Sequence, residues 1–212
     1  EKELLDWLVA LARDSGIGAL LKFTRAGRTP ARASDLFKDA GFRERVSYYH
    51  MRLETSEAPP TPRELPGELD LVSYRGDEDF DLLWSVLEAA FGTADQEEAD
   101  AYEQTKTVFD AIAFAYFPIC VESATRKAVG TIAMTSQGDS GGIVTFGVIP
   151  DFQGQGIGSI LMQRALDHAW KTGVRTLDLA VRVENPQAIG IYARFGFQIV
   201  PERTTVVLQK EM

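Results

Sequence analysis

The hydrophobic and polar positions of the chain follow two periods, one of two residues and one near 3.6 residues. Residues 69–74 alternate as a half-buried strand does, whereas Phe80, Leu83 and Leu87 recur at helical spacing. Along residues 68–212 these periods predict strands at 69–74, 117–122, 128–135, 143–148, 176–183 and 204–208, and helices at 79–91, after 95, at 158–171 and at 185–195. The order βααβββαβαβ indicates an α/β fold whose sheet has mixed strand directions.

A proline-rich segment divides the chain. Residues 56–67 hold Pro59, Pro60, Pro62 and Pro66 among polar residues, a composition that disfavours both helix and sheet. We therefore expect a linker at 56–67 between a domain over 1–55 and a second domain over 68–212.

The first third of the chain repeats the closing pattern of the second domain. Helical and strand patterns alternate at 4–13, 19–23, 31–38 and 46–53. When Gly41-Phe42 is aligned with Gly196-Phe197, Phe37 falls opposite Tyr192. The alternative is a coincidental αβαβ segment, since that order is common. If the repeat is real, residues 1–55 are half of a second unit in which a phenylalanine replaces the tyrosine, so that this half is expected to be non-catalytic. We expect this half to pack on another part of the protein.

Composition narrows the class of protein. With 212 residues, 45% of them hydrophobic, the chain can bury a real core, and its formal charge of −9 argues against a coat for nucleic acid. The longest apolar run, 108–121, is too short to span a bilayer, and the first residues do not resemble a secretion signal. The single cysteine, Cys120, excludes an internal disulfide and reads as a small buried hydrophobe rather than a nucleophile. Together these features lead us to expect a cytoplasmic protein. We expect no metal site, because His50 and His168 are isolated from other possible metal ligands.

Three alternating glycines, Gly154, Gly156 and Gly158, join an apolar run to the helix predicted at 158–171. Glycines before a helix let backbone N–H groups converge on one anion, so the segment predicts a site for a phosphorylated cofactor. A dinucleotide fingerprint fits the spacing but not the context, because residues 150–153 separate the strand from the first glycine. A tight turn without a ligand is the remaining alternative.

Two motifs in this order resemble those of the GNAT superfamily of N-acetyltransferases. The first is Val148-Ile149-Pro150-Asp151-Phe152-Gln153-Gly154-Gln155-Gly156-Ile157-Gly158, and the second is Asn185-Pro186-Gln187-Ala188-Ile189-Gly190-Ile191-Tyr192-Ala193-Arg194-Phe195-Gly196-Phe197. The resemblance covers residues 68–212 and implies a mixed, mostly antiparallel sheet that is flanked by helices and splayed at a central parallel strand pair. With the partial first unit, the layout is similar to that of the tandem mycothiol synthase family, and the chain would then be a piece of a longer tandem protein.

The resemblance also implies a cofactor, acetyl-CoA, and the residues that bind it. Gln153 and Gln155 stand where the family often has arginine or lysine, so the diphosphate would depend more on backbone N–H groups. The expected cofactor contacts are Phe146, Gly147, Val148, Gln153, Gly154, Gln155, Gly156, Ile157, Gly158, Ser159, Asn185, Ala188 and Tyr192.

Tyr192 is the expected catalytic acid, since a phenol keeps its proton at neutral pH and can protonate the leaving thiolate. Its alternative is an ordinary packed aromatic side chain. No motif identifies a base; Glu122, Asp139, Glu184 or a water chain could serve.

The resemblance implies an acceptor pocket shaped by the first two helices of the second domain, which residues 92–100 join. The expected activity is acetyl transfer to the primary amine of a small molecule by direct attack in a ternary complex. The expected partners include neither nucleic acid nor membrane. A homodimer is compatible with the sequence. The alternative is an acyl-CoA sensor or interaction module without catalysis, which would share the glycine loop but need no acid.

Overall fold

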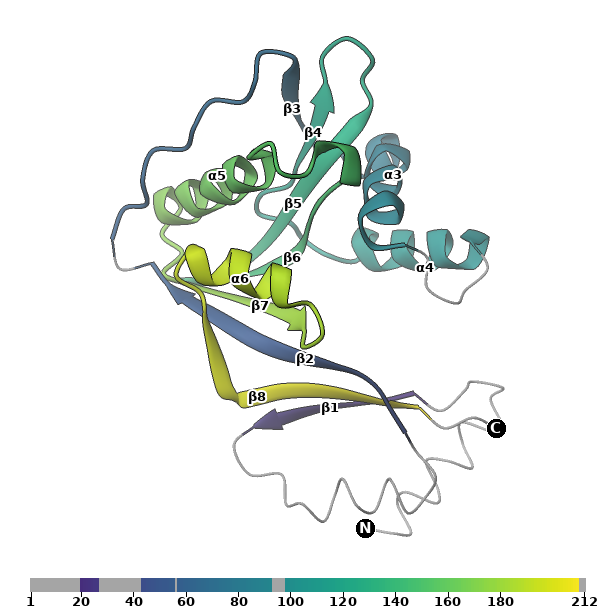
Figure 1. The fold of residues 1–212 in the computed structure, drawn as a ribbon, viewed down its shortest axis with the longest axis vertical. Coiled ribbons are helices and arrows are strands. Elements are labelled where there is room, and N and C mark those ends of the chain that lie inside the picture. The colour runs from purple at the N-terminus through teal and green to yellow at the C-terminus, as the bar shows by residue number, and fades with distance from the viewer. Residues whose placement is uncertain (1–19, 27–42, 56, 93–97, 210–212) are drawn as a thin grey trace. The chain divides into compact units, whose positions relative to one another are not determined.

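The computed structural model describes residues 20–26, 43–55, 57–92 and 98–209 (Figure 1). The chain forms two compact units. One comprises residues 54–178, and the other combines residues 1–53 with residues 179–212. The last strand and helix of the chain therefore share a unit with its first strands. The predicted helices at 4–13 and 31–38 lie outside the described residues.

The sheet of the unit 54–178 is mostly antiparallel. Four strands follow one another as neighbours, namely β3 (Leu69–Ser73), β4 (Pro118–Glu122), β5 (Ala128–Gln137) and β6 (Ser140–Val148). On its other side β6 pairs in parallel with β7 (Thr176–Arg182). This arrangement confirms the predicted mixed sheet with one parallel pair.

The parallel pairing is short. It runs from Ser140 opposite Thr176 to Gly142 opposite Asp178, whereas β6 continues to Val148. Beyond Gly142 the residues of β6 keep their pairing with β5, where Phe146 lies opposite Ile132 and Val148 opposite Gly130. The end of β6 is the part that the family resemblance assigns to the cofactor arm.

Helices cover both faces of this sheet. Helix α3 (Phe80–Phe91) follows a 3₁₀ turn, η1 (Gly76–Asp79), and precedes α4 (Glu98–Asp110), while α5 (Ile157–Lys171) follows the glycine loop. Figure 1 shows α3 and α5 on opposite sides of β5 and β6.

Two glycines show how closely the helices approach β6. A Cβ atom on Gly147 would lie 3.1 Å from Cζ of Phe91 in α3. A Cβ atom on Gly158 of α5 would lie 3.2 Å from Cζ of Phe146. Because successive residues of a strand face opposite sides, residue 146 contacts α5 and residue 147 contacts α3. The glycines allow both helices to pack directly on the strand.

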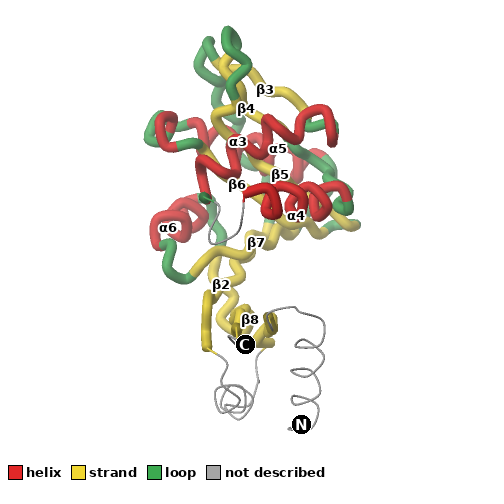
Figure 2. The backbone as a smooth tube through the Cα atoms, turned by 90° about the vertical axis from the view of Figure 1, so that its right-hand side faces the viewer, coloured by secondary structure: helices red, strands yellow, loops and turns green. Residues whose placement is uncertain are grey.

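In the other unit the strands come from distant parts of the sequence. Strand β8 (Gln198–Gln209) pairs antiparallel with both β1 (Leu20–Ala26) and β2 (Arg43–Glu54), so that it lies between them. Figure 2 shows β2 and β8 side by side. Helix α6 (Pro186–Arg194) precedes β8. The domain division at residues 56–67 remains a prediction.

The structure corrects two strand boundaries. Strand β8 begins at Gln198, not at residue 204, because Gln198 and Ile199 pair with Arg52 and Met51 of β2. The register then shifts before Thr204, and Pro201 lies inside this irregularity, where a missing N–H costs least. Strand β6 begins at Ser140, three residues before the predicted start, within the glycine-rich turn.

None of the helices in the described part of the chain combines the length and the apolar character that a membrane span requires. Cys120 is fully buried in β4, as predicted, and burial raises the pKa of its thiol to about 11.

Candidate active site

The three glycines of the loop before α5 have two different roles. Gly154 and Gly156 have φ angles of +75° and +84°, and no atom lies within 4 Å of a Cβ added to either. Both positions therefore need the left-handed backbone that glycine adopts without strain. Gly158 does not have a positive φ and is required instead by the ring of Phe146. The backbone of the loop is exposed, and the last glycine brings the helix onto the sheet.

The N-terminus of α5 is suited to an anion. Its N-cap residue, Gly156, has no side chain to accept a hydrogen bond from the first turn, and the first turn holds no acidic residue. The first N–H groups of a helix have no partner within the helix and carry the positive end of its dipole. Ile157, Gly158 and Ser159 contribute such groups here. A diphosphate group fits this end of the helix.

The two glutamines of the loop bind the loop's own backbone. Nε2 of Gln153 donates to the carbonyl oxygen of Val148 at 2.9 Å, and Nε2 of Gln155 donates to the carbonyl oxygen of Asp151 at 3.0 Å. Both side chains therefore hold the loop together. The sequence suggested them only as cofactor contacts, and the structure adds this second role.

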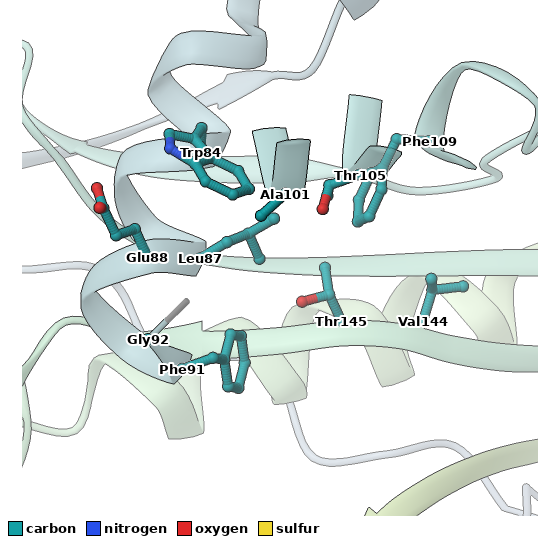
Figure 3. A pocket seen from close by; sticks show the side chains of 10 residues that line it. All are labelled: Trp84, Leu87, Glu88, Phe91, Gly92, Ala101, Thr105, Phe109, Val144 and Thr145. Atoms are coloured by element: carbon teal, nitrogen blue, oxygen red, sulfur yellow. The ribbon is translucent and has the colours of Figure 1, made fainter. Parts of the chain in front are cut away.

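A pocket of about 310 Å³ lies between α3, α4 and β6 (Figure 3). Its walls are mostly apolar, and its lining residues are Trp84, Leu87, Glu88, Phe91, Gly92, Ala101, Thr105, Phe109, Val144 and Thr145. The pocket lies within the unit 54–178. Helices α3 and α4 thus form two walls of an open pocket, and its use as the acceptor site stays a prediction.

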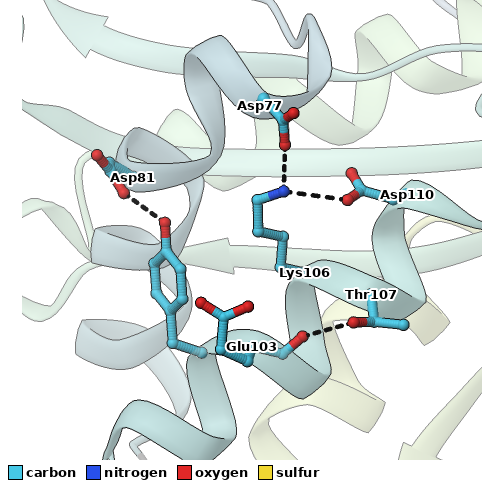
Figure 4. Close-up of polar contacts among 7 residues, drawn as sticks. Asp77, Asp81, Glu103, Lys106, Thr107 and Asp110 are labelled. Atoms are coloured by element: carbon cyan, nitrogen blue, oxygen red, sulfur yellow. Dashed lines mark hydrogen bonds and ion pairs between the residues drawn. The ribbon is translucent and has the colours of Figure 1, made fainter.

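Aromatic contacts fix α4 against α3. The ring of Tyr102 meets those of Phe80 and Trp84 edge-on, at centroid distances of 4.9 and 5.4 Å. Its hydroxyl donates to Oδ1 of Asp81 at 2.6 Å (Figure 4). This hydrogen bond, with burial and the negative charge of Asp81, raises the pKa of Tyr102.

A lysine links α4 to η1, the turn that precedes α3. The ammonium group of Lys106 in α4 binds Asp77 of η1 and Asp110 one turn further along α4 (Figure 4). Hydrogen bonds to these two carboxylates raise the pKa of Lys106. Together Tyr102 and Lys106 hold the two helical walls of the pocket at a fixed separation.

The candidate acid, Tyr192, lies in α6 of the other unit. Its side chain is 8% exposed, and its ring contacts that of Phe197 at a centroid distance of 6.0 Å. Burial raises the pKa of the phenol to about 12. Tyr192 is therefore protonated throughout the neutral range.

Asn185 is the N-cap residue of α6. Its Oδ1 accepts a hydrogen bond from the backbone N–H of Ala188 at 2.9 Å. This contact explains the Asn-Pro pair locally, because the asparagine caps the helix and the proline occupies its first turn. A contact between Asn185 or Ala188 and a cofactor stays a prediction.

The three carboxylates considered as bases lie outside the pocket lining. Glu122 accepts a hydrogen bond from Thr125, Asp139 accepts one from Ser140, and Glu184 is exposed. The carboxylate that does line the pocket is Glu88, which the sequence analysis did not consider. Glu88 follows Trp84 by four residues and so lies on the same side of α3, but the sequence alone does not show that this side lines a pocket.

Comparison with known proteins identifies the family. Residues 80–197 match the model of the acetyltransferase (GNAT) family, and the chain belongs to this family of acyltransferase enzymes. The match extends from the start of α3 to the residue before β8. It includes the glycine loop, the pocket walls and Tyr192.

Among curated proteins, the chain is similar to the mycothiol acetyltransferase of Propionibacterium freudenreichii subsp. shermanii, with 30% identity over 176 residues, or 79% of this chain and 55% of that protein. The mycothiol acetyltransferase of Actinosynnema mirum is 29% identical over 170 residues, 78% of this chain and 56% of its own length. The chain thus spans about half the length of these relatives.

Among solved structures, a GCN5-related N-acetyltransferase from Sphaerobacter thermophilus has a TM-score of 0.71 at 21% identity, covering 98% of this chain and 68% of that one. A tandem GNAT protein from the clavulanic acid biosynthesis pathway has a TM-score of 0.70 at 20% identity, covering 95% and 67%. These similarities support the fold.

Proposed function

We propose that this protein is an acetyl-CoA-dependent N-acetyltransferase that transfers the acetyl group to a primary amine of a small molecule. The observation that carries the proposal is the N-terminus of α5, where two glycines with positive φ precede a helix without a side-chain cap or an acidic first turn. Membership of the GNAT family, which generally uses acetyl-CoA, supports the assignment of this anion site to coenzyme A.

The residues of the loop would hold the diphosphate through backbone N–H groups, from Gly154 to Ser159. The glutamines Gln153 and Gln155 keep that backbone in place through their own hydrogen bonds. The end of β6, with Phe146, Gly147 and Val148, would run beside the pantetheine arm. Asn185, Ala188 and Tyr192 are the proposed contacts from α6.

When bound, acetyl-CoA supplies an acetyl group activated as a thioester. The neutral acceptor amine would attack its carbonyl carbon to form the amide C–N bond, the C–S bond would break, and the proton lost from nitrogen would pass to water. We assign to Tyr192 the proton that the departing sulfur takes up, because its phenol is buried and its raised pKa keeps it protonated. A protonated phenol held in this way can act at any pH in the neutral range.

The acceptor is proposed to be a small molecule because the pocket between α3, α4 and β6 is of ligand size. Relatives differ in what their names describe. A relative from Escherichia coli K12, 41% identical over 59 residues, is named for acetylation of an alanine of ribosomal protein bS18. Because the names of the relatives do not agree on one kind of acceptor, the proposal of a small molecule rests on the pocket of this chain.

The test has two readouts. Calorimetry measures the binding of coenzyme A, and release of free thiol from acetyl-CoA measures transfer to a panel of small amines. We expect binding together with amine-dependent thiol release, and slower release by the Tyr192→Phe variant. Absence of coenzyme A binding contradicts the proposal. Tight binding without transfer to any amine contradicts it in favour of an acyl-CoA sensor.

A further inference from the structure

The lining of the pocket specifies the chemistry of its ligand. Three aromatic rings, those of Trp84, Phe91 and Phe109, line it together with three aliphatic side chains, and two threonine hydroxyls add polar contacts. Among the residues that the structure describes, Glu88 is the charged residue of this lining, and no lysine or arginine belongs to it. An anionic group would meet no cation among these residues, and a polyhydroxylated ligand would place many of its hydroxyls against apolar walls.

Glu88 is available to bind a cation. Its side chain is half-buried, and within the described residues none of the ion pairs involves it. A carboxylate in a largely apolar wall gains most from a ligand that brings a positive charge and N–H donors. A primary ammonium group meets both requirements.

One end of the pocket lies close to β6 at Gly147. In Figure 3, Glu88, Phe91 and Gly92 lie at one end of the group, and Phe109, Thr105 and Val144 at the other. Phe91 packs against Gly147, since a Cβ atom there would lie 3.1 Å from its Cζ atom. Gly147 lies in the part of β6 that is proposed to run beside the pantetheine arm. The end with the carboxylate is therefore the end nearest the proposed thioester.

The other end of the pocket would hold the body of the acceptor. Phe109 and Ala101 are each 9% exposed, whereas Val144 is 41% exposed, so this end has a buried apolar wall on α4 and a more open wall on β6. The volume of about 310 Å³ is at the small end of the range for ligand pockets. An apolar chain or a single aromatic ring fits within it.

We propose that the acceptor is a primary amine on an apolar body, with its ammonium group bound by Glu88 and its body between α3 and α4. This assignment rests on the proposed acetyltransferase function and adds the substrate class to it. Glu88 would hold the amine beside Phe91 before the amine loses its proton.

The experiment measures amine binding directly by calorimetry, with coenzyme A present. The probes are phenylethylamine, its uncharged analogue phenylethanol, the amino sugar glucosamine, and a series from n-butylamine to n-hexylamine. The variant is Glu88→Gln, and the matched control is Glu64→Gln, which removes an exposed carboxylate outside the pocket.

We expect phenylethylamine to bind about tenfold more weakly to Glu88→Gln and equally well to the control, as loss of a charge-assisted hydrogen bond implies. Phenylethanol should bind both variants alike. Each added methylene of the alkylamines should tighten binding about threefold until the pocket is full.

Two results would overturn the assignment. One is phenylethylamine binding that is undetectable, or that does not change in Glu88→Gln. The other is glucosamine binding that is as tight as that of phenylethylamine or tighter. Failure of the proposed function is a separate result, because it appears as absent coenzyme A binding or as absent thiol release with every amine.

Discussion

The side-chain amide of Gln153 lies 2.9 Å from the carbonyl oxygen of Val148 and donates a hydrogen bond to it. The bond joins the last residue of β6 to the residue before the first loop glycine. The loop between β6 and α5 is thus held together by a hydrogen bond from one of its own side chains. A second such bond, from Gln155 to Asp151, lies inside the same connection.

If the hydrogen bond from Gln153 orients the N–H groups of the loop, its removal weakens cofactor binding. We expect Gln153→Ala to raise the Kd for coenzyme A about fivefold, the equivalent of one ordinary hydrogen bond. Calorimetry at constant salt measures the effect. Gln137→Ala, which removes an exposed glutamine at the end of β5, serves as the control and should leave the Kd unchanged. Equal Kd values for both variants would show that the hydrogen bond from Gln153 to Val148 does not contribute to coenzyme A binding.

The loop glycines are required either for a positive φ or for close packing, and a glycine-to-alanine change should affect the stability differently in the two cases. Gly156→Ala forces a side chain into a positive φ and should destabilise the unit by about 1 kcal/mol. Gly190→Ala in α6 meets nothing within 4 Å and should stabilise by up to about 1 kcal/mol. Urea unfolding of each variant gives the free energies.

Gly158→Ala is the informative variant of this series. It has the same helix propensity benefit as Gly190→Ala, but its Cβ atom would lie 3.2 Å from the ring of Phe146. We expect this overpacking to cancel the benefit, at a cost of about 1 kcal/mol or more. If the methyl group stabilises here as much as at position 190, close packing does not explain this glycine.

Burial of Tyr192 predicts a dependence of stability on alkaline pH. The folded state raises the pKa of this phenol to about 12, above the reference value of about 10 in an unfolded chain. The unfolded state then loses its proton first, so the stabilisation is complete below pH ~10 and is lost between ~10 and ~12, by about 3 kcal/mol at most.

Tyr192→Phe tests this dependence, because phenylalanine keeps the ring and removes the ionisable group. The difference in unfolding free energy between wild type and variant should be constant from pH 7 to 9 and should shift in favour of the variant above pH ~10. A constant difference up to pH ~11 would show that the phenol is not buried in solution. In the same variant we expect kcat to fall about a hundredfold if the phenol is the acid.

Cys120 should be inert in the folded protein. Its side chain is fully buried, and burial raises the pKa of the thiol to about 11, so that little thiolate is present at pH 8. Iodoacetamide should modify it only after unfolding in urea, as mass spectrometry can show. Rapid modification of the native protein would contradict this and would require an open path to β4.

The local pattern of the sequence predicted most elements of the unit 54–178. Alternation marked β3, apolar runs on either side of a polar turn marked β4 and β5, and the glycines marked the start of α5, because these signals depend on residues close together in the chain. The early start of β8 could not be found this way. It depends on Gln198 and Ile199 meeting Arg52 and Met51, and Pro201 in the same segment argues locally against a strand.

The candidate site shows the same division. The glycine loop was predictable because a motif contains its whole geometry. Glu88 was not, because a carboxylate in an amphipathic helix normally faces water, and only the approach of α4 and β6 makes it part of a pocket. Phe109 comes from the far end of α4, and no periodicity in the sequence relates it to Trp84.

The position of β8 between β1 and β2 has a consequence for synthesis in the cell. Leu20 pairs with Gln209 and Arg43 with the same residue, so the first two described strands leave the ribosome long before their shared partner exists. At usual elongation rates this delay is of the order of ten to thirty seconds. During it the edges of β1 and β2 are open to other chains. Nascent copies on one polysome should therefore aggregate more readily than the finished protein, and a chaperone that covers the early strands would raise the yield.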